Sequence, residues 1–124
     1  MLKITEIAFT CYPVTDMAVA RKFYEETLGL TPTMVVGEAG GMQWTEYDIG
    51  PGTLALGAGA PDWHPHADGC SVGLEVADFD AAIADLRAKN AKFRMEPFAT
   101  PVCKMAMVSD PDGNTICLHK RNAQ

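Results

Sequence analysis

The distribution of hydrophobic and polar positions predicts an extended segment at the start of each half of the chain. Apolar and β-branched side chains run through Ile4–Cys11 and again through Cys70–Val76, with the partial alternation that is typical of strands. Shorter apolar runs, bounded by Gly, Pro or Asp turns, predict six further strands. Their approximate bounds are Thr33–Gly37, Met42–Ile49, Thr53–Gly57, Lys92–Phe98, Cys103–Ser109 and Asn114–His119.

Helical spacing follows the first strand of each half. Thr15 or Asp16 caps the start of the first helix, and Gly29 ends it. The second helix begins after Asp78 and ends at Asn90. Apolar side chains recur every three or four residues, so one face of each helix is expected to pack in the core. These residues are Met17, Ala20, Phe23, Tyr24 and Leu28 in the first helix, and Phe79, Ile83 and Leu86 in the second.

The two halves resemble each other at an offset of 62 residues, which is half of the 124-residue length. Val14–Met17 is echoed by Val76–Phe79, and Asp48–Leu56 is echoed by Asp110–Leu118. Each half therefore has the order strand, helix and three strands. One helix covers only one face of a four-stranded sheet, so neither half is expected to be stable alone.

We therefore predict a single α+β domain over residues 1–124, built from two βαβββ modules in a pseudo-two-fold arrangement. The first module covers about residues 1–58, and the second covers about residues 70–124. Residues 59–69 are mainly small, polar or proline, and we interpret them as a linker between the modules.

Composition and charge narrow the classes of partner. The chain is 48% hydrophobic and 21% charged, which is typical of a globular protein. Ten basic and sixteen acidic side chains give a net charge of −6, which argues against nucleic acid or an anionic membrane surface as a partner. No apolar run approaches the ~18 residues of a membrane span. The N-terminus lacks the layout of a signal peptide, so we expect a cytoplasmic location.

The spacing of the cysteines does not indicate a chemical role for them. None of the four belongs to a CxxC pair, and three lie in or beside predicted strands. We interpret them as small buried hydrophobic residues rather than as disulfide partners or metal ligands. They are Cys11, Cys70, Cys103 and Cys117.

Three local motifs in this layout point to a known family. They are the pair Phe23 and Tyr24, the Leu-Gly-Leu segment at residues 28–30, and the Asp-Pro-Asp-Gly-Asn turn at residues 110–114. With the two modules, they resemble the vicinal oxygen chelate superfamily, the group of glyoxalase I, bleomycin-resistance proteins and extradiol dioxygenases. The resemblance covers nearly the whole chain. It implies a curled eight-stranded mixed sheet that encloses a cleft, and a homodimer whose cleft is often built from both subunits.

The resemblance also implies where a metal ion would bind. The superfamily's metalloenzymes take His, Gln or Glu ligands from the first and last strands of each module. Counting from the helix-capping Asp residues, from Asn114 of the Asp-Pro-Asp-Gly-Asn turn and by the 62-residue offset, the corresponding positions in this chain hold Phe9, Ala55, Ser71 and Cys117. A phenyl ring and a methyl group cannot ligate a metal, a serine hydroxyl is a weak ligand, and one thiolate does not make a site. We therefore expect no metal and no other cofactor, which leaves open whether the protein is an enzyme.

Strand alternation from these four positions predicts which side chains line the cleft. Trp44 is expected to add an aromatic wall and two methionines an adaptable one. Glu75 is either a structural carboxylate or a base in the cleft, and His119 shares a strand face with Cys117. The predicted cleft residues are Phe9, Cys11, Trp44, Ala55, Ser71, Glu75, Met105, Met107, Cys117 and His119.

The predicted function is metal-independent binding of a small organic molecule in this cleft. One alternative is a divergent metal-dependent lyase or dioxygenase of the same superfamily, which would recruit Cys117, His119 or Glu75. Another is a non-catalytic dimerisation module whose cleft is filled core. In the linker, His64 and His66 are interpreted as solvated side chains, with adventitious binding of a divalent ion as the alternative.

Overall fold

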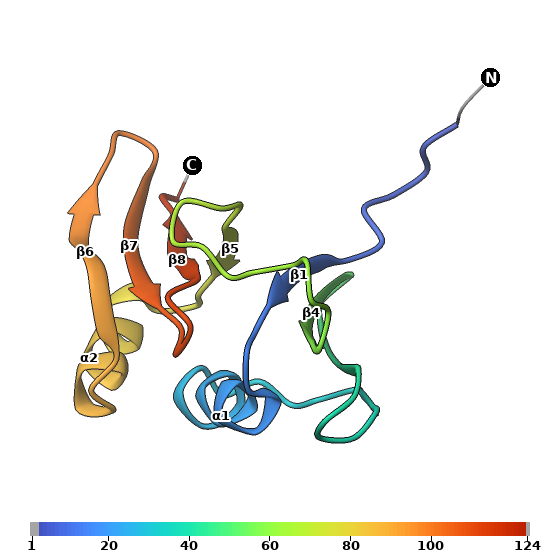
Figure 1. The fold of residues 1–124 in the computed structure, drawn as a ribbon. Helices are drawn as coiled ribbons and strands as arrows, with labels where there is room; N and C mark the ends of the chain where they lie inside the picture. The colour runs from blue at the N-terminus through green and yellow to red at the C-terminus, as the bar shows by residue number, and fades with distance from the viewer. Residues whose placement is uncertain (1–2, 124) are drawn as a thin grey trace.

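A computed structural model describes residues 3–123 of the chain, and these form two modules of the same element order (Figure 1). The elements of the first module are β1 (Thr10–Pro13), α1 (Met17–Lys22), the short π-helix η1 (Phe23–Thr27), β2 (Met34–Val36), β3 (Gln43–Ile49) and β4 (Gly52–Ala58). Those of the second are β5 (Val72–Glu75), α2 (Phe79–Ala88), β6 (Lys92–Ala99), β7 (Cys103–Ser109) and β8 (Thr115–Arg121). The predicted α+β fold of two modules is confirmed.

The eight strands are divided between two four-stranded mixed sheets. The strand order is β1-β4-β3-β2 in the first sheet and β5-β8-β7-β6 in the second. In each sheet the first strand of the module runs parallel to the last, and the other pairs are antiparallel. β1 and β5 are therefore edge strands of equivalent position, and the two sheets are not closed into one.

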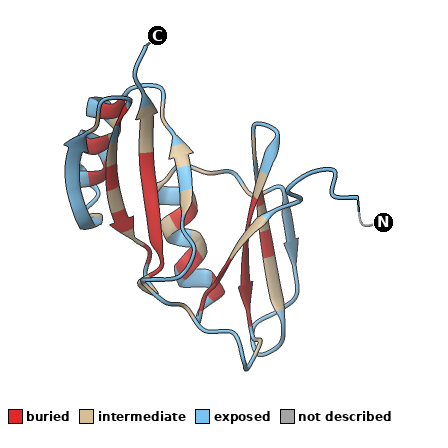
Figure 2. Ribbon diagram, turned by 90° about the horizontal axis from the view of Figure 1, so that it is seen from above, coloured by how far each residue is buried: buried red, intermediate tan, exposed pale blue. Residues whose placement is uncertain are grey.

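The main hydrophobic core is shared by the two modules. Buried side chains of α1, η1 and both sheets form one cluster, and Figure 2 shows that burial is concentrated on the middle strands. Its largest members include Tyr24, Tyr47, Leu54, Leu56, Val108, Ile116 and Leu118. A smaller cluster lies beneath α2 and consists of Phe79, Ile83 and Ala106. This arrangement explains why each module needs the other to cover its apolar surface.

Polar contacts join the modules along a seam beside β1. The hydroxyl of Tyr12 donates to the Thr115 carbonyl oxygen at 2.7 Å and accepts from the backbone N–H of Val72 at 2.6 Å. The side-chain amide of Asn114 donates to the carbonyl oxygen of Pro13 at 2.9 Å. Since Asn114 belongs to the last turn of the second module, this turn is tied directly to the first strand of the first module.

The first strand is shorter than its hydrophobic run predicts. Pairing begins at Thr10, and residues 3–9 leave the body of the protein as an extended arm (Figure 1). Ile4 is 80% exposed and Ile7 is 83% exposed. The physical reason is the length of the neighbouring strand: β4 begins at Gly52, so none of residues 3–123 lies alongside most of this arm.

The helix caps agree with the prediction, and the first helix differs in detail. Asp16 accepts from the N–H of Val19, and Asp78 accepts from the N–H of Ala81 at 3.1 Å. Thr15, the other candidate cap, instead bonds through its hydroxyl to Asp112 of the second module. The first helix widens into a π-helical turn at Phe23, with a backbone bond from Leu28 to Phe23.

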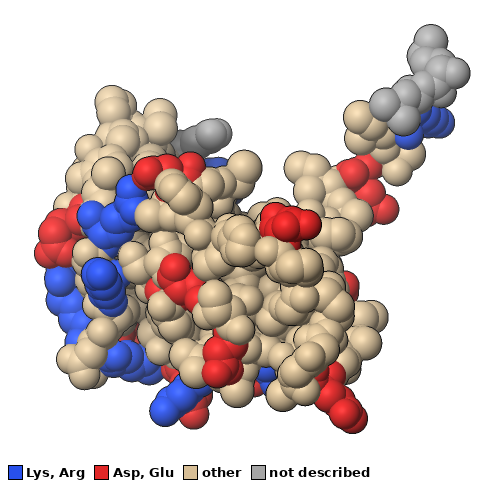
Figure 3. Space-filling model, viewed as in Figure 1, with Lys and Arg blue, Asp and Glu red and all other residues tan. Residues whose placement is uncertain are grey.

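Charged side chains are spread over the surface, with Lys and Arg gathered over α2 and β6 (Figure 3). Most of these cations are paired. Arg87 bonds Glu96, Lys89 bonds Asp85, and Arg94 bonds Asp68 of the linker. Within residues 3–123 no helix is both long enough and apolar enough to cross a membrane.

Candidate functional site

The sheet register sorts the predicted cleft residues onto two surfaces, one in each module. On the first sheet Cys11 lies opposite Ala55, and Trp44 lies opposite Gly57. We call this surface the first wall; its members are Phe9, Cys11, Trp44, Glu46, Ala55 and Gly57, together with Trp63, whose indole lies over Gly57. On the second sheet the register pairs Glu75 and Met105 with His119, and Gly73 and Met107 with Cys117. We call this surface, with those six residues, the second wall.

Each wall lies on the side of its sheet that faces away from the shared core. Leu54 and Leu56 belong to that core, so the alternate residue Ala55 points the other way. In the second sheet Ile116 and Leu118 belong to the core in the same manner. One chain therefore presents two walls, and it does not bring all the predicted residues into a single enclosed cleft. Ser71 is exposed and immediately precedes β5.

The first wall is aromatic. The rings of Phe9 and Trp44 meet edge to face, with centroids 5.5 Å apart. A β-carbon added to Gly57 would lie 2.5 Å from the indole of Trp63 and 3.3 Å from the indole of Trp44, so both indoles lie directly over this glycine. The indole N–H of Trp44 donates to the carboxylate of Glu46 at 2.7 Å, which fixes the ring.

Trp63 is a wall residue that the sequence prediction missed. Residues 59–69 have neither helical nor strand periodicity, so their sequence gives no information about where this linker packs. Gly57 is the sequence feature that could have indicated this contact, because a glycine inside an apolar strand often marks the close approach of another group. In the structure that group is the indole of Trp63, which remains 38% exposed.

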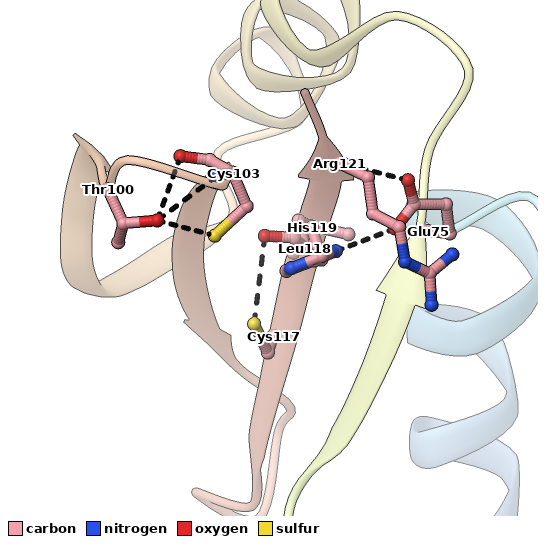
Figure 4. Close-up of polar contacts among 7 residues, drawn as sticks. All are labelled: Glu75, Thr100, Cys103, Cys117, Leu118, His119 and Arg121. Atoms are coloured by element: carbon pink, nitrogen blue, oxygen red, sulfur yellow. Dashed lines mark hydrogen bonds and ion pairs between the residues drawn. The ribbon is translucent and has the colours of Figure 1, made fainter. Parts of the chain in front are cut away.

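The second wall holds an oriented histidine. Nδ1 of His119 lies 2.6 Å from Oε1 of Glu75, and the backbone N–H of Arg121 donates to Oε2 of Glu75 at 2.8 Å (Figure 4). These two hydrogen bonds, the backbone bond first, hold the pKa of Glu75 below its usual range. An ionised carboxylate accepts from Nδ1–H, so Nε2 is the ring nitrogen that remains for another partner.

The four cysteines differ in burial. Cys103 and Cys117 are buried and Cys11 is half-buried, whereas the prediction of burial is wrong for Cys70, which is exposed because it lies just before β5. Desolvation raises the pKa of the Cys117 thiol, and it raises that of Cys11 to about 12. All four thiols are free. A buried neutral thiol is a poor nucleophile.

The donor set at the superfamily's metal positions does not fit a metal ion. Phe9 and Ala55 offer no donor atom, Ser71 offers a hydroxyl, and the thiol of Cys117 donates to the carbonyl oxygen of Leu118. Among residues 3–123 no three His, Cys, Asp or Glu side chains are grouped so as to hold a metal ion. In the linker, Nδ1 of His66 already accepts from the backbone N–H of Asp68 at 3.0 Å.

A groove of about 300 Å³ lies at the seam between the walls. It brings Phe9 of the first wall and Glu75 of the second into one lining. The remaining lining residues are Ile7, Thr10, Ile49, Gly52, Thr53, Leu54, Val72, Gly73 and Leu74. The groove therefore runs between the two edge strands β1 and β5, where neither sheet continues.

Comparisons with a family model and with solved structures point to the same superfamily. The sequence model of the Glyoxalase/Bleomycin resistance protein/Dioxygenase superfamily matches residues 6–118. No curated protein matches the chain. Among solved structures, TnmS3, an antibiotic binding protein from Streptomyces sp. CB03234, is 28% identical with a TM-score of 0.80, covering 98% of this chain and 100% of that chain.

Two further structures extend the comparison. A glyoxalase/bleomycin resistance protein, also from Streptomyces sp. CB03234, is 30% identical with a TM-score of 0.73, covering 91% of this chain and 98% of that chain. A domain of the same superfamily from Frankia sp. EAN1pec has a TM-score of 0.77 over 97% of this chain and 94% of that chain. At 15% identity, the Frankia domain is informative about the fold alone.

Proposed function

The chain belongs to the Glyoxalase/Bleomycin resistance protein/Dioxygenase superfamily, and from this premise we propose that it binds a small organic molecule at its two walls without a metal ion. The observation that carries the proposal is the chemistry of the walls. Aromatic rings cover the first, methionine and cysteine side chains cover the second, and the metal positions hold Phe9, Ala55, Ser71 and Cys117. Apolar surfaces with a few placed polar groups are typical of sites for organic ligands.

The properties of the individual side chains support an aromatic or otherwise flat ligand. Indole rings offer large rigid contact areas, and Trp44 and Trp63 lie together over Gly57. Met105 and Met107 are flexible and polarisable, so they adjust to ligands of irregular shape. TnmS3 is an antibiotic binding protein, and its 28% identity over nearly the whole chain supports the same class of function.

We further propose that the protein is a homodimer in which the first wall of one protomer faces the second wall of its partner. Both walls lie on outer faces, and the apolar arm before β1 is exposed, with Phe9 49% and Ile7 83% exposed. Exposed apolar surface of this kind is a common mark of an interface. The free thiols are consistent with a cytoplasmic, reducing location. Most cations over α2 and β6 are paired, which supports the absence of a nucleic acid partner.

The two tryptophans of the chain provide a direct test, because both lie on the first wall. Nitrobenzene, a flat quencher of indole fluorescence, is expected to quench the protein saturably. Gly57→Ala places a methyl group where the indoles now lie, and it is expected to weaken quenching at least about tenfold in apparent affinity. Val19→Ala, on the exposed side of α1, is the matched control and should bind like the wild type.

Unsaturable quenching that is the same in all three proteins would overturn the proposal and favour a dimerisation module. Metal independence has its own measurement. The melting temperature of chelator-treated protein should be unchanged by Ni, Zn, Mn or Fe(II), and elemental analysis of the untreated protein should find no stoichiometric metal. A stoichiometric metal with a shift of several degrees would instead favour a divergent metal-dependent lyase or dioxygenase.

A further inference from the structure

The Glu75–His119 pair differs from an ordinary surface ion pair because both oxygens of the carboxylate have hydrogen-bond partners. Oε1 of Glu75 bonds the imidazole, and Oε2 accepts from the backbone N–H of Arg121. The parallel register of β5 and β8 places the two side chains beside each other, so the contact is fixed by two adjacent strands of the sheet. A carboxylate bonded in this way orients the histidine ring. Both of its oxygens already accept a hydrogen bond, so the histidine is the member of the pair that is left to bond a ligand.

The imidazole of His119 belongs to the second wall, where β8 lies between β5 and β7. Nδ1 is the ring nitrogen bonded to Glu75, so Nε2 is the one left for a ligand, and Figure 4 shows His119 on β8 with the Glu75 carboxylate beside it. On β7 the residue opposite His119 is Met105, whose own partner on β6 is Phe98. Cys117 is the neighbouring wall residue on β8. The imidazole is 26% exposed, so a molecule lying on these apolar side chains would reach Nε2.

We propose that the Glu75–His119 pair recognises an acidic hydroxyl group, so that the ligand of this wall is a flat aromatic molecule carrying a phenol. This inference rests on the proposed function and specifies the ligand's chemistry. The ring of the phenol lies on Met105, Met107 and Phe98, and its O–H donates to Nε2 of His119. When the proton moves, the O–H bond breaks and an Nε2–H bond forms, giving a phenolate beside an imidazolium whose Nδ1–H remains bonded to Glu75.

The charges around the site favour a neutral hydroxyl over a ligand that arrives as an anion. Glu75 is ionised next to His119, and the chain carries a net charge of −6. A carboxylate ligand would be repelled by Glu75, a repulsion that the nearby Arg121 guanidinium reduces, whereas a phenol becomes charged only as the imidazole becomes positive. The other titratable groups facing this part of the wall are the thiols of Cys103 and Cys117 and the guanidinium of Arg121.

A pair of probes that differ by one hydroxyl tests the inference. 4-Nitrophenol and nitrobenzene are titrated into the protein by equilibrium dialysis, which does not depend on the tryptophans of the other wall. We expect 4-nitrophenol to bind at least about tenfold more tightly than nitrobenzene, the ratio that corresponds to about 1.4 kcal/mol for one hydrogen bond to a charged or polarised partner. Bound 4-nitrophenol should show the absorption band of its anion at a pH where the free compound is mostly protonated.

Two variants separate recognition from a merely structural role. His119→Gln keeps a polar side chain of similar size that cannot take up a proton, so the affinity ratio should fall to about one and the anion band should disappear. Glu75→Gln keeps an acceptor for the Arg121 N–H, and we expect it to weaken the anion band because a neutral amide stabilises an imidazolium less than a carboxylate does. Both residues are partly exposed, and thermal melting checks that the variants are folded.

The failure of this inference differs from the failure of the proposed function. If neither probe binds, the proposed function itself is wrong. If both probes bind with equal affinity to wild type and to His119→Gln, the organic-ligand site stands and the phenol inference is overturned. If 4-nitrophenol binds more tightly but with no anion band, or with a band that survives in His119→Gln, the proposed role of the imidazole as proton acceptor is overturned.

Discussion

Replacing Tyr12 by phenylalanine tests whether a single hydroxyl group holds the two modules together. This hydroxyl is bonded on both sides, at 2.7 Å to the Thr115 carbonyl and at 2.6 Å to the Val72 N–H, and the tyrosine is only 3% exposed. Phenylalanine fills the same volume, so no cavity forms and the cost comes from two backbone groups left without partners. Each unpaired buried group costs about 1–3 kcal/mol, and because Val72 is only half-buried we expect a total of about 2–3 kcal/mol.

The matched control for this variant is Tyr47→Phe. The hydroxyl of Tyr47 donates to Oε2 of Glu25 at 2.9 Å within one module, and Glu25 keeps its ion pair with Arg21. Removing it should therefore cost only about 0.5–1.5 kcal/mol. Urea unfolding followed by tryptophan fluorescence gives the free energy of unfolding for both variants, and the slope with urea should be unchanged. If Tyr12→Phe loses no more stability than Tyr47→Phe, the hydroxyl does not hold the seam.

Three further predictions follow from the polar groups of the structure. Asp110→Ala removes the acceptor of Tyr24 and Asn114, and we expect a loss of at least about 3 kcal/mol in urea unfolding; a loss below 1 kcal/mol would contradict the network. The pKa of Glu75 is lowered in the folded protein, so the stability advantage of wild type over Glu75→Gln should be present at neutral pH and should disappear as pH falls below about 4.5; an advantage that persists in acid would refute it. Cys70 should react with iodoacetamide well before Cys117, as peptide mass spectrometry would measure.

The internal repeat made the fold largely predictable. The 62-residue offset between Asp48–Leu56 and Asp110–Leu118 corresponds to β4 and β8, which take the same place in their sheets. The cap at Asp78 was also predictable, because a short acidic side chain before an apolar helical stripe has a local physical meaning. These features depend on neighbours in sequence or on a repeated pattern.

The parts that could not be predicted depend on contacts between distant segments. The start of β1 at Thr10 is set by the length of β4, which the run from Ile4 to Cys11 does not encode. The partner of Glu75 depends on the register between β5 and β8, since a shift by one residue would turn His119 to the other face.

The shared core between the modules has a consequence for how the gene product can be divided. A chain cut within the linker would yield two fragments, each with four strands and the helical segment of its module, and each would leave its side of the core exposed to water. Separately they should be poorly folded, and mixed together they should fold on each other and restore the Tyr12 seam. The protein would then act as a split reporter, with reassembly signalled by the return of tryptophan fluorescence typical of the first wall.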